Sequence, residues 1–400
     1  MTPTYKHLFQ RALAAAPERL HFAAHSHHLW PDASYVGQLA AWEDAARLAD
    51  RKWDRVMGEV WPAAQAHVAR ELNLPAIDSV VFAGNTHDFL LRLISAIPHR
   101  PVRILSTDSE FHSFRRQASR WIEGGTITLE TIATSDPDYE TRLLTRAASG
   151  EHDLIFVSQV FFGTGRTFDS ISQLAALSRP EGPWVVIDGY HGFMARTQDL
   201  SAVADRIFYL AGGYKYAMAG EGVALMHAPP GYGARPEITG WYAEFDDLSL
   251  PPGQVGYAPD ARRYMGATFD PSGLYRFVAV RDLLASEGLG TAEIEAHARA
   301  LLDRIVEGMK TTPLAAAEWL NPPAPDGRYP ARFLALRSPL AGAWQQWLIE
   351  EDIVTDRRGD VLRIGVGLYH DQRDVTRLLE ALAHLPAQNT TETDRIAAGA

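Results

Sequence analysis

The chain has 400 residues, enough for two domains or for one large domain with a smaller one appended. Its net charge of −11 and the lack of a basic stripe argue against binding to nucleic acid or to an anionic membrane. Cysteine does not occur, which excludes disulfides, thiolate zinc sites and any mechanism that needs a cysteine nucleophile or persulfide carrier. No apolar run has the length of a signal peptide or a membrane span, so we expect a soluble, cytoplasmic protein.

A cluster of histidines, His25-Ser26-His27-His28, comes early in the chain. Histidines at these short offsets without a nearby acidic or cysteine partner seldom form a ligand set, and we predict no metal. A substrate-facing loop or a solvated surface run is the preferred interpretation. Pro31 and Asp32 are typical of a helix start, and a partly periodic apolar face follows, made by Leu39, Trp42, Ala46 and Leu48.

A polar turn then separates a predicted strand from a predicted helix. A helix is expected from Trp61 to Leu74, and Val80 to Ala83 read as a short strand. The turn Gly84-Asn85-Thr86-His87-Asp88 follows, and apolar residues at helical spacing continue to Pro98. Free backbone N–H groups at such a helix start, with the side chains of Asn85 and Thr86, form a cradle for phosphate. The alternative is an ordinary helix cap.

From here short apolar runs alternate with helical patterns. Strands are predicted at residues 102–105, 127–129, 154–157, 184–187 and 207–210. Near-continuous apolar strands alternating with helices imply an α/β fold with a mostly parallel sheet covered on both faces. Ligands of such sheets bind at the carboxyl ends of the strands.

Two charged residues follow neighbouring predicted strands at this edge. Asp188 ends the strand at 184–187, and Lys215 follows the strand at 207–210 within Gly212-Gly213-Tyr214-Lys215-Tyr216. Burial lowers the pKa of a lysine and favours the neutral amine, which Schiff-base chemistry requires. A surface lysine on a glycine turn is the alternative for this stretch taken by itself.

The rest of the chain contains a long loop and a second folding pattern. Residues 229–268 are rich in glycine, proline and aromatic side chains, and a loop of this length inside a domain is usually functional. Helices from about Ser272 to Leu284 and from Ala292 to Met309 precede a smaller α+β unit. The tail after Gln388 is polar and alanine-rich, which predicts disorder.

Asp188 and Lys215 together meet the needs of pyridoxal phosphate. The lysine forms a Schiff base with the cofactor, and the aspartate keeps the pyridine nitrogen protonated so that the ring accepts electrons. His191 is positioned to orient the carboxylate or to pack beneath the ring, although a structural core histidine remains possible. Phe111 or His112, at another strand-to-helix turn, is expected to stack on the ring.

With these residues the chain resembles fold-type I pyridoxal-phosphate enzymes of the class V aminotransferase superfamily and is most similar to kynureninase. The resemblance covers residues from about Phe22 to Tyr369. It implies a large domain with a seven-stranded type of sheet and a smaller C-terminal α+β domain. The implied division is an N-terminal segment 1–60, a cofactor domain 61–285, a small domain 286–387 and a disordered tail 388–400.

The resemblance also implies roles for individual residues near the cofactor. Lys215 is implied as the Schiff-base residue and Tyr214 as a phosphate ligand, while Asn85 and Thr86 match the family's phosphate turn loosely. Asp188 and His191 match a strand that ends in aspartate with histidine three residues later. The aromatic ring that stacks on the cofactor corresponds to Phe111.

Further implied roles belong to the substrate and to a partner subunit. Trp241, in Gly240-Trp241-Tyr242, resembles a tryptophan that reaches the phosphate. Gly266-Ala267-Thr268 resembles a loop that approaches the cofactor from the partner subunit, so a homodimer is implied. Arg363 resembles the arginine that grips the substrate α-carboxylate, and a guanidinium fork suits a carboxylate. A solvated charge on a strand is the alternative for Arg363.

The substrate side departs from the kynureninase pattern. His25-Ser26-His27-His28 replaces Asn-Ser-Leu-Gly, so Ser26 is retained while His25 is not, and both are candidate substrate-binding residues. Ala267-Thr268-Phe269-Asp270-Pro271 replaces a Ser-Asn-Pro-Pro loop. The sequence therefore predicts the cofactor more firmly than the substrate.

Three functions follow from these residues. The first is hydrolytic Cβ–Cγ cleavage of a kynurenine-type amino acid. The second is transamination, racemisation or an α/β-elimination on the same scaffold, since bond choice depends on which Cα bond stands perpendicular to the ring. A non-catalytic protein that binds pyridoxal phosphate is the third.

Overall fold

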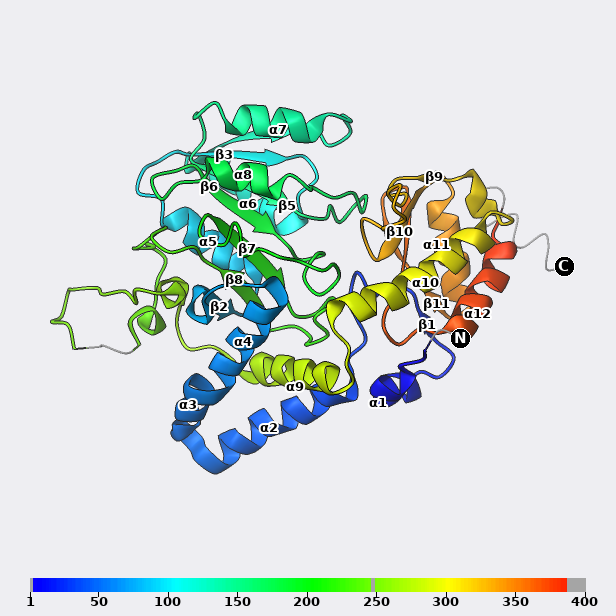
Figure 1. Cartoon of the computed structure of the whole chain (residues 1–400), viewed down its shortest axis with the longest axis horizontal. Helices are drawn as coiled ribbons and strands as arrows, with labels where there is room; N and C mark the ends of the chain where they lie inside the picture. Colours follow the sequence, from blue (N-terminus) through cyan, green and yellow to red (C-terminus); the bar gives the residue numbers. More distant parts are fainter. Residues whose placement is uncertain (1–2, 246–248, 387–400) are drawn as a thin grey trace. The chain divides into compact units, whose positions relative to one another are not determined.

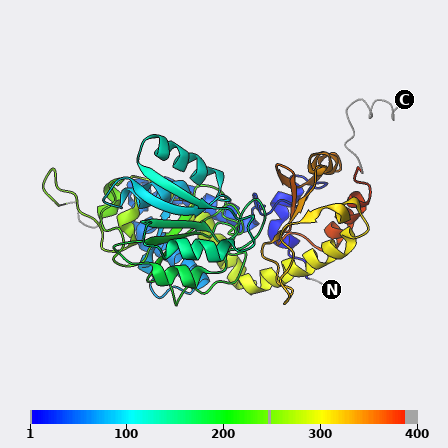
Figure 2. The same ribbon diagram turned by 90° about the horizontal axis from the view of Figure 1, so that it is seen from above.

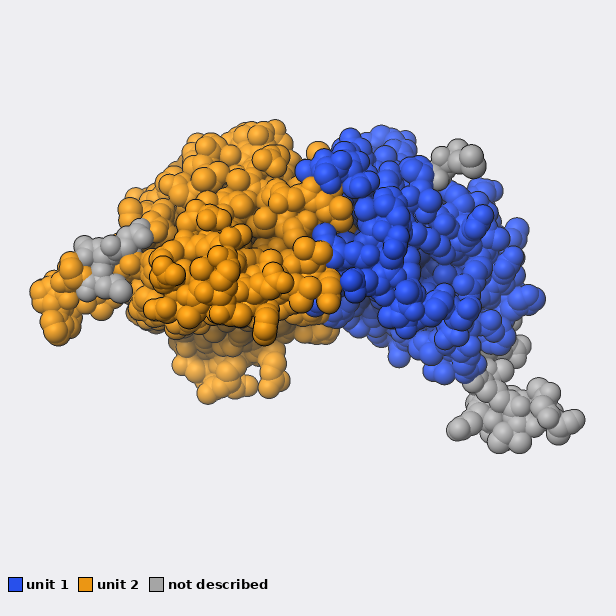
Figure 3. Space-filling view, turned by 90° about the horizontal axis from the view of Figure 1, so that it is seen from below, with its two compact units in different colours: residues 1–33, 163–166, 284–400 blue, residues 34–162, 167–283 orange. Residues whose placement is uncertain are grey.

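A computed structural model describes residues 3–245 and 249–386 of the chain (Figure 1). The chain forms two compact units (Figure 3). The larger unit comprises residues 34–162 and 167–283, and the smaller unit comprises residues 1–33, 163–166 and 284–400. Residues 34–60 thus belong to the larger unit, and the predicted tail 388–400 lies outside the described residues.

A seven-stranded sheet forms the centre of the larger unit, with the strand order β2-β8-β7-β6-β5-β3-β4. β8 runs antiparallel to both of its neighbours, and the remaining pairings are parallel. The predicted α/β fold with a mostly parallel sheet is therefore confirmed. The strands are β2 (Val80–Ala83), β3 (Val102–Thr107), β4 (Ile127–Ile132), β5 (Leu154–Ser158), β6 (Trp184–Asp188), β7 (Ile207–Gly212) and β8 (Ala224–His227).

Helices cover this sheet on either side (Figure 2). Every residue of β5 and of β7 is buried, as expected for strands packed on both faces. Trp61, Ala64, Val68 and Leu72, which recur at helical spacing, are all buried. The helices are α4 (Trp61–Leu72), α5 (Thr86–Ser95), α6 (His112–Glu123), α7 (Tyr139–Ala147) and α8 (Ile171–Leu177).

The helix predicted after Pro31 exists, but its apolar face is not the face that packs. In α2 (Asp32–Leu48) the side chains of Leu39 and Trp42 are 41% and 69% exposed. The packed side is small and polar: a Cβ added to Gly37 would lie 2.6 Å from the carbonyl oxygen of Tyr275 in α9 (Ser272–Ser286). The Tyr275 hydroxyl donates to Asp44 at 2.9 Å. Close backbone approach and a buried hydrogen bond therefore override the apolar pattern. The short α3 (Lys52–Arg55) follows α2.

The smaller unit is built on a four-stranded sheet in the order β12-β13-β10-β9, with antiparallel pairings. A separate pair of parallel strands joins β1 (Leu20–His21) to β11 (Ile353–Val354). The other strands are β9 (Glu318–Trp319), β10 (Phe333–Arg337), β12 (Asp356–Arg358) and β13 (Val361–Gly365), and the helices are α1 (Gln10–Ala14), α10 (Thr291–Met309), α11 (Ala341–Glu350) and α12 (Gln372–Ala383).

An apolar core joins these elements of the smaller unit. Leu301 of α10, Leu334 of β10 and Leu362 of β13 are each fully buried in it. Helices α11 and α12 contribute Trp344 and Leu378 to the same core. Among the described residues of the whole chain, no helix combines the length and the apolar character needed to cross a membrane.

Candidate active site

A cavity of about 200 Å³ lies in the larger unit, where β5, β6 and β7 end at their carboxyl termini. This is the edge at which parallel sheets of this kind bind ligands. Seven of the predicted site residues line it together: Asn85, Thr86, Phe111, Asp188, His191, Tyr214 and Lys215. Its other lining residues are His87, Ser113, Ser158, Val160, Phe162 and Tyr190.

Lys215 is held in this cavity by aromatic rings and an imidazole. The residue is only 5% exposed, and its Nζ atom lies 2.7 Å from Nε2 of His191. The same Nζ lies 4.5 Å from the ring centre of Tyr190 and 5.8 Å from that of Tyr214. Aromatic faces attract a cation, and the histidine nitrogen can accept a proton from the amine. The lysine is therefore fixed beside a group that can share its proton.

A glycine before the lysine leaves room for this arrangement. A Cβ added to Gly212 would lie 2.0 Å from the hydroxyl of Tyr190, far inside any tolerable contact. Tyr190 in turn packs against Tyr214, with ring centres 5.0 Å apart. The glycine that precedes the lysine motif is thus required because an aromatic ring packs directly on the backbone at the end of β7.

Asp188 ends β6 and places its carboxyl group in the same cavity. One of its carboxylate oxygens accepts a hydrogen bond from the backbone N–H of Tyr190 at 3.0 Å. Burial raises the pKa of Asp188, and the Tyr190 hydrogen bond and the charge of Lys215 act in the opposite direction. A protonated pyridine nitrogen would supply the opposite charge that a buried carboxylate needs.

The polar turn after β2 caps a helix whose start faces the cavity. The side-chain oxygen of Asn85 accepts from the backbone N–H of Asp88 at 3.0 Å, so Asn85 is the N-cap of the ten-residue helix α5. The turn can therefore act both as a helix cap and as a phosphate site, because Asn85 and Thr86 also line the cavity. The N–H groups and the dipole of such a helix start favour a phosphate group.

Aromatic side chains also line the cavity. Phe111, which precedes α6, packs edge-on against Phe162 with ring centres 5.2 Å apart. The Nζ atom of Lys215 lies 5.5 Å from the Phe111 ring centre. A flat aromatic ligand attached to the lysine would meet this ring, as the sequence predicts.

A buried carboxylate that the sequence analysis missed bonds to Ser158, one of the residues that line the cavity. Glu110 is fully buried and accepts from the backbone N–H of Ser158 at 3.0 Å and from the Thr107 hydroxyl at 2.6 Å. Burial raises the pKa of Glu110 to about 7, an effect that the Ser158 and Thr107 hydrogen bonds oppose and that the charge of Asp188 reinforces. Glu110 directly precedes Phe111, and this position was its only signal in the sequence.

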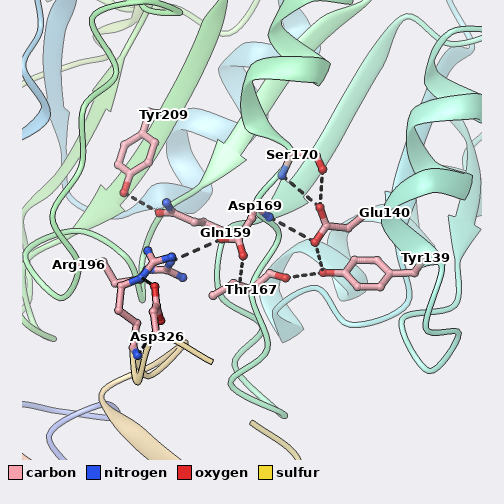
Figure 4. A network of polar contacts seen from close by, with 10 residues as sticks. Tyr139, Glu140, Gln159, Thr167, Asp169, Ser170, Arg196, Tyr209 and Asp326 are labelled. Carbon is pink, nitrogen blue, oxygen red and sulfur yellow. Dashed lines mark hydrogen bonds and ion pairs between the residues drawn. The ribbon is translucent and has the colours of Figure 1, made fainter. Parts of the chain in front are cut away.

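A second polar network braces the loop after β5 (Figure 4). The backbone N–H of Gln159 donates to the carbonyl of Asp188 at 2.9 Å, and its side-chain oxygen accepts from the Tyr209 hydroxyl at 3.2 Å. Further along this loop, the backbone N–H and the hydroxyl of Ser170 donate to Glu140 of α7. The carboxyl end of β6 is thereby tied to the strands on both sides.

These residues fit pyridoxal phosphate. The cavity offers a buried amine for the aldehyde, a carboxylate for the ring nitrogen, a helix start for the phosphate and an aromatic side chain for the ring face. These four groups lie at or after the ends of different strands but line one cavity, so a single small ligand would contact all four. When bound, the cofactor acts as an electron sink for a substrate carbanion.

Trp241 and Thr268, also predicted to contact the cofactor, do not line this cavity. They contact each other, since the indole N–H of Trp241 donates to the Thr268 hydroxyl at 3.2 Å. Trp241 is 44% exposed. The two loops that carry them thus form one surface feature of the larger unit.

The predicted substrate residues belong to the smaller unit. Arg363 of β13 is 2% exposed and forms an ion pair with Asp356 of β12. His25 is fully buried, stacks on Phe333 at 4.5 Å and lies 3.7 Å from the same aspartate. Ser26 contacts His27 at 3.3 Å through its hydroxyl. In the described part of the chain, no three histidine or acidic side chains are grouped so as to hold a metal ion.

Comparison with known proteins places this site in a family. The model of the aminotransferase class-V family matches residues 53–326. The isopenicillin N epimerase of Streptomyces clavuligerus is 27% identical over 371 residues, which cover 86% of this chain and 89% of that protein. The enzyme of the same name from Amycolatopsis lactamdurans is 24% identical over 342 residues, covering 77% and 81%.

Solved structures share the fold at low sequence identity. The cystine C–S lyase C-DES superposes with a TM-score of 0.78 at 17% identity, covering 94% of this chain and 99% of that one. A variant of C-DES has been solved with glycine covalently linked to its pyridoxal-phosphate cofactor. A cysteine desulfurase from Thermococcus onnurineus superposes with a TM-score of 0.75 at 15% identity over the full length of both chains. The protein belongs to the aminotransferase class-V family of pyridoxal-phosphate-dependent enzymes.

Proposed function

We propose that this enzyme removes and returns the α-proton of an amino acid, with inversion at Cα as the outcome. The observation that carries the proposal is the 2.7 Å contact between Nζ of Lys215 and Nε2 of His191, inside a cavity that also holds Asp188. An amine next to a proton acceptor can take a proton from a substrate and pass it on. Two relatives that cover most of this chain are named as epimerases, which favours this outcome.

The chain's own residues divide the work in this proposal. Lys215 carries the cofactor and moves the proton, and His191 holds or accepts that proton at Nε2. Asp188 keeps the ring nitrogen protonated, the start of α5 holds the phosphate, and Phe111 covers the ring face. The family resemblance supports Arg363 as the residue that binds the substrate α-carboxylate.

Proton exchange in deuterated water tests the proposal. The holoenzyme is incubated with single enantiomers of amino acids, without a keto acid. The loss of the α-proton is followed by NMR, and the opposite enantiomer is measured by chiral chromatography. Exchange together with inversion supports an epimerase or racemase, and a panel of amino acids without any exchange contradicts the proposal. The Lys215→Ala variant is the control, since it lacks the exchanging amine.

The resemblance to kynureninase makes Cβ–Cγ cleavage the second candidate. Lys215, Asp188 and Arg363 serve that reaction equally well, because it also begins by removing the α-proton. Formation of anthranilate and alanine from kynurenine would favour it over epimerisation. Amino transfer that requires a keto acid would indicate a transaminase, and release of a β-substituent would indicate an elimination.

We also propose that the enzyme is a homodimer in which the loops of Trp241 and Thr268 reach the partner's cofactor. These side chains bond to each other at the surface instead of lining their own chain's cavity. The exposed apolar side of α2 offers a further surface for a second copy, with Tyr35, Val36, Leu39 and Trp42 each at least 41% exposed. Light scattering gives the oligomeric state. Mixing Lys215→Ala with Trp241→Ala chains should restore activity, since only the mixed dimer has one complete site.

A further inference from the structure

Arg363, which we propose to bind the substrate carboxylate, already pairs with a carboxylate of its own chain. Asp356 stands directly opposite Arg363 in the antiparallel pairing of β12 with β13. The Nη2 atom of Arg363 donates to Oδ2 of Asp356. Both side chains are buried, with 2% of Arg363 and 12% of Asp356 exposed. The guanidinium is therefore neutralised by an anion of its own chain.

Asp356 has a second cationic partner that does not depend on Arg363. Nη1 of Arg358 donates to Oδ1 of Asp356 at 3.0 Å, and the backbone N–H of Arg357 donates to the same oxygen at 2.7 Å. The Arg358 side chain is 40% exposed, whereas Arg363 is enclosed. Asp356 thus bridges one buried and one accessible arginine through different oxygens.

The surroundings of Arg363 make this internal anion necessary. Its guanidinium lies 5.5 Å from the ring centre of Phe333, which is itself fully buried. His25, also fully buried, stacks on the same phenylalanine. A buried charge without a counter-ion is strongly unfavourable, so Asp356 stabilises the buried guanidinium. A substrate carboxylate at Arg363 would stand next to Asp356, and two like charges at that distance repel each other.

We propose that Asp356 is a specificity-determining residue that a substrate carboxylate must displace from Arg363. This inference rests on the proposed role of Arg363. In the bound state Arg363 pairs with the substrate while Asp356 keeps its bonds to Arg358 and to the Arg357 backbone. The exchange leaves every charge compensated, because one carboxylate replaces another at the buried guanidinium.

The exchange selects the chemical class of substrate. An ester or an amide carries no negative charge and cannot take the place of Asp356 beside a buried guanidinium. A free carboxylate carries the negative charge and can take the place of Asp356. The Asp356–Arg363 pair therefore lowers the affinity for every ligand that must displace Asp356, and only a ligand that itself binds the guanidinium strongly, such as a carboxylate, still occupies the site.

Binding of a simple carboxylate to the holoenzyme tests this. Propionate is the probe and propionamide is its uncharged counterpart, and dissociation constants are measured by saturation-transfer NMR. In Asp356→Asn the competing charge is absent, and we expect propionate to bind about tenfold more tightly, a typical size for two linked equilibria. Arg358→Gln should change binding in the opposite direction, because Asp356 then has Arg363 as its main cation. Asp360→Asn, in the exposed turn of the same hairpin, is the matched control and should leave both constants unchanged.

The outcomes separate this inference from the proposed function. Weaker or unchanged propionate binding in Asp356→Asn, with binding still abolished in Arg363→Ala, overturns the role of Asp356 alone. Propionate binding that survives Arg363→Ala overturns the carboxylate role of Arg363 and the inference with it. If Asp356→Asn does not fold, as judged by thermal melting and cofactor absorption, Arg358→Gln still decides the question through its opposite sign.

Discussion

The Nζ atom of Lys215 lies 2.7 Å from Nε2 of His191, and both residues are almost fully buried. The two come from the ends of adjacent parallel strands, β7 and β6, which pair in register from Val185 to Asp188. Each residue lies three positions beyond the end of its strand, so the pairing of the two strands brings the two turns together. It places a proton acceptor beside the amine that we propose to carry the cofactor.

Replacing His191 by glutamine should leave the cofactor bound and slow proton transfer. Glutamine can still hydrogen-bond to Lys215 but does not accept a proton, so we expect α-proton exchange to fall by about a hundredfold or more. Exchange is measured by NMR in deuterated water, and the visible absorption of the holoenzyme reports the cofactor. His7→Gln, on an exposed histidine, is the control. An unchanged exchange rate in His191→Gln would show that the histidine is structural.

Asp188→Asn should bind pyridoxal phosphate and yet turn over poorly. The amide keeps the shape of the side chain but removes the charge that holds a proton on the ring nitrogen. We expect a loss of about a hundredfold or more in kcat, the size seen when one preorganised electrostatic group is removed. Steady-state kinetics on any confirmed substrate measures it. Asp199→Asn removes a carboxylate at an exposed position and should have no effect; an equal loss in both variants would rule out a specific role.

Glu110 should make the enzyme less stable as the pH rises. Its pKa is raised from 4.5 to about 7 in the folded chain, chiefly because the residue is buried. The folded chain therefore keeps a proton that the unfolded chain releases, and the free energy of unfolding falls by about 3 kcal/mol as the pH rises from 4.5 to 7.

Urea unfolding at pH 5 and pH 8 measures this effect. The free energy of unfolding at pH 5 minus that at pH 8 should change by about this amount in Glu110→Gln relative to the wild type, since glutamine does not titrate. Glu123→Gln, at the exposed end of α6, should behave as the wild type. Identical pH dependence in Glu110→Gln and the wild type would contradict the raised pKa.

Two histidines of the smaller unit should have the opposite effect in acid. Burial lowers the pKa of His28 to about 3 and that of His21 to about 4, both from 6.5. In the unfolded chain these histidines bind protons below pH 6.5, whereas in the folded chain they stay neutral. The free energy of unfolding therefore falls as the pH drops below 6.5. Each histidine lowers the free energy of unfolding by about 1.4 kcal/mol for every pH unit below 6.5, until its pKa in the folded chain is reached.

His28→Asn isolates one of these contributions. Asparagine can still donate to the carbonyl of Leu29, which lies 2.7 Å from Nδ1 of the histidine. Between pH 7 and pH 5 the variant should lose less stability than the wild type, as measured by urea unfolding. His27→Asn, at the neighbouring exposed position, should lose as much as the wild type. Equal losses in His28→Asn and the wild type would contradict the prediction.

Much of the larger unit could be predicted because its signals are local. Apolar runs of strand length alternate with helical patterns, and this alternation implies parallel strands whose carboxyl ends share one edge. Asp188 and Lys215 end successive runs of this kind, so their proximity followed from chain order. Asn85 and Phe111 stood at strand-to-helix turns and were found by the same reasoning.

Contacts set by packing or by pairing register could not be found in this way. Glu110 contacts Ser158, which is 48 residues away in the sequence, and only the folded sheet brings the two together. The apolar pattern of α2 suggested a buried face, but the close approach at Gly37 turned Leu39 and Trp42 outward within this chain.

The chain by itself determined the cofactor edge, because residue type and strand order suffice to place an amine and a carboxylate there. The tertiary structure decided what surrounds the charges. The resemblance implied that Arg363 binds a carboxylate, and the register of β12 against β13 puts Asp356 opposite it. The turn at Gly359 and Asp360 sets this register, and a shift of one residue would have turned the aspartate to the other face of the sheet, away from Arg363.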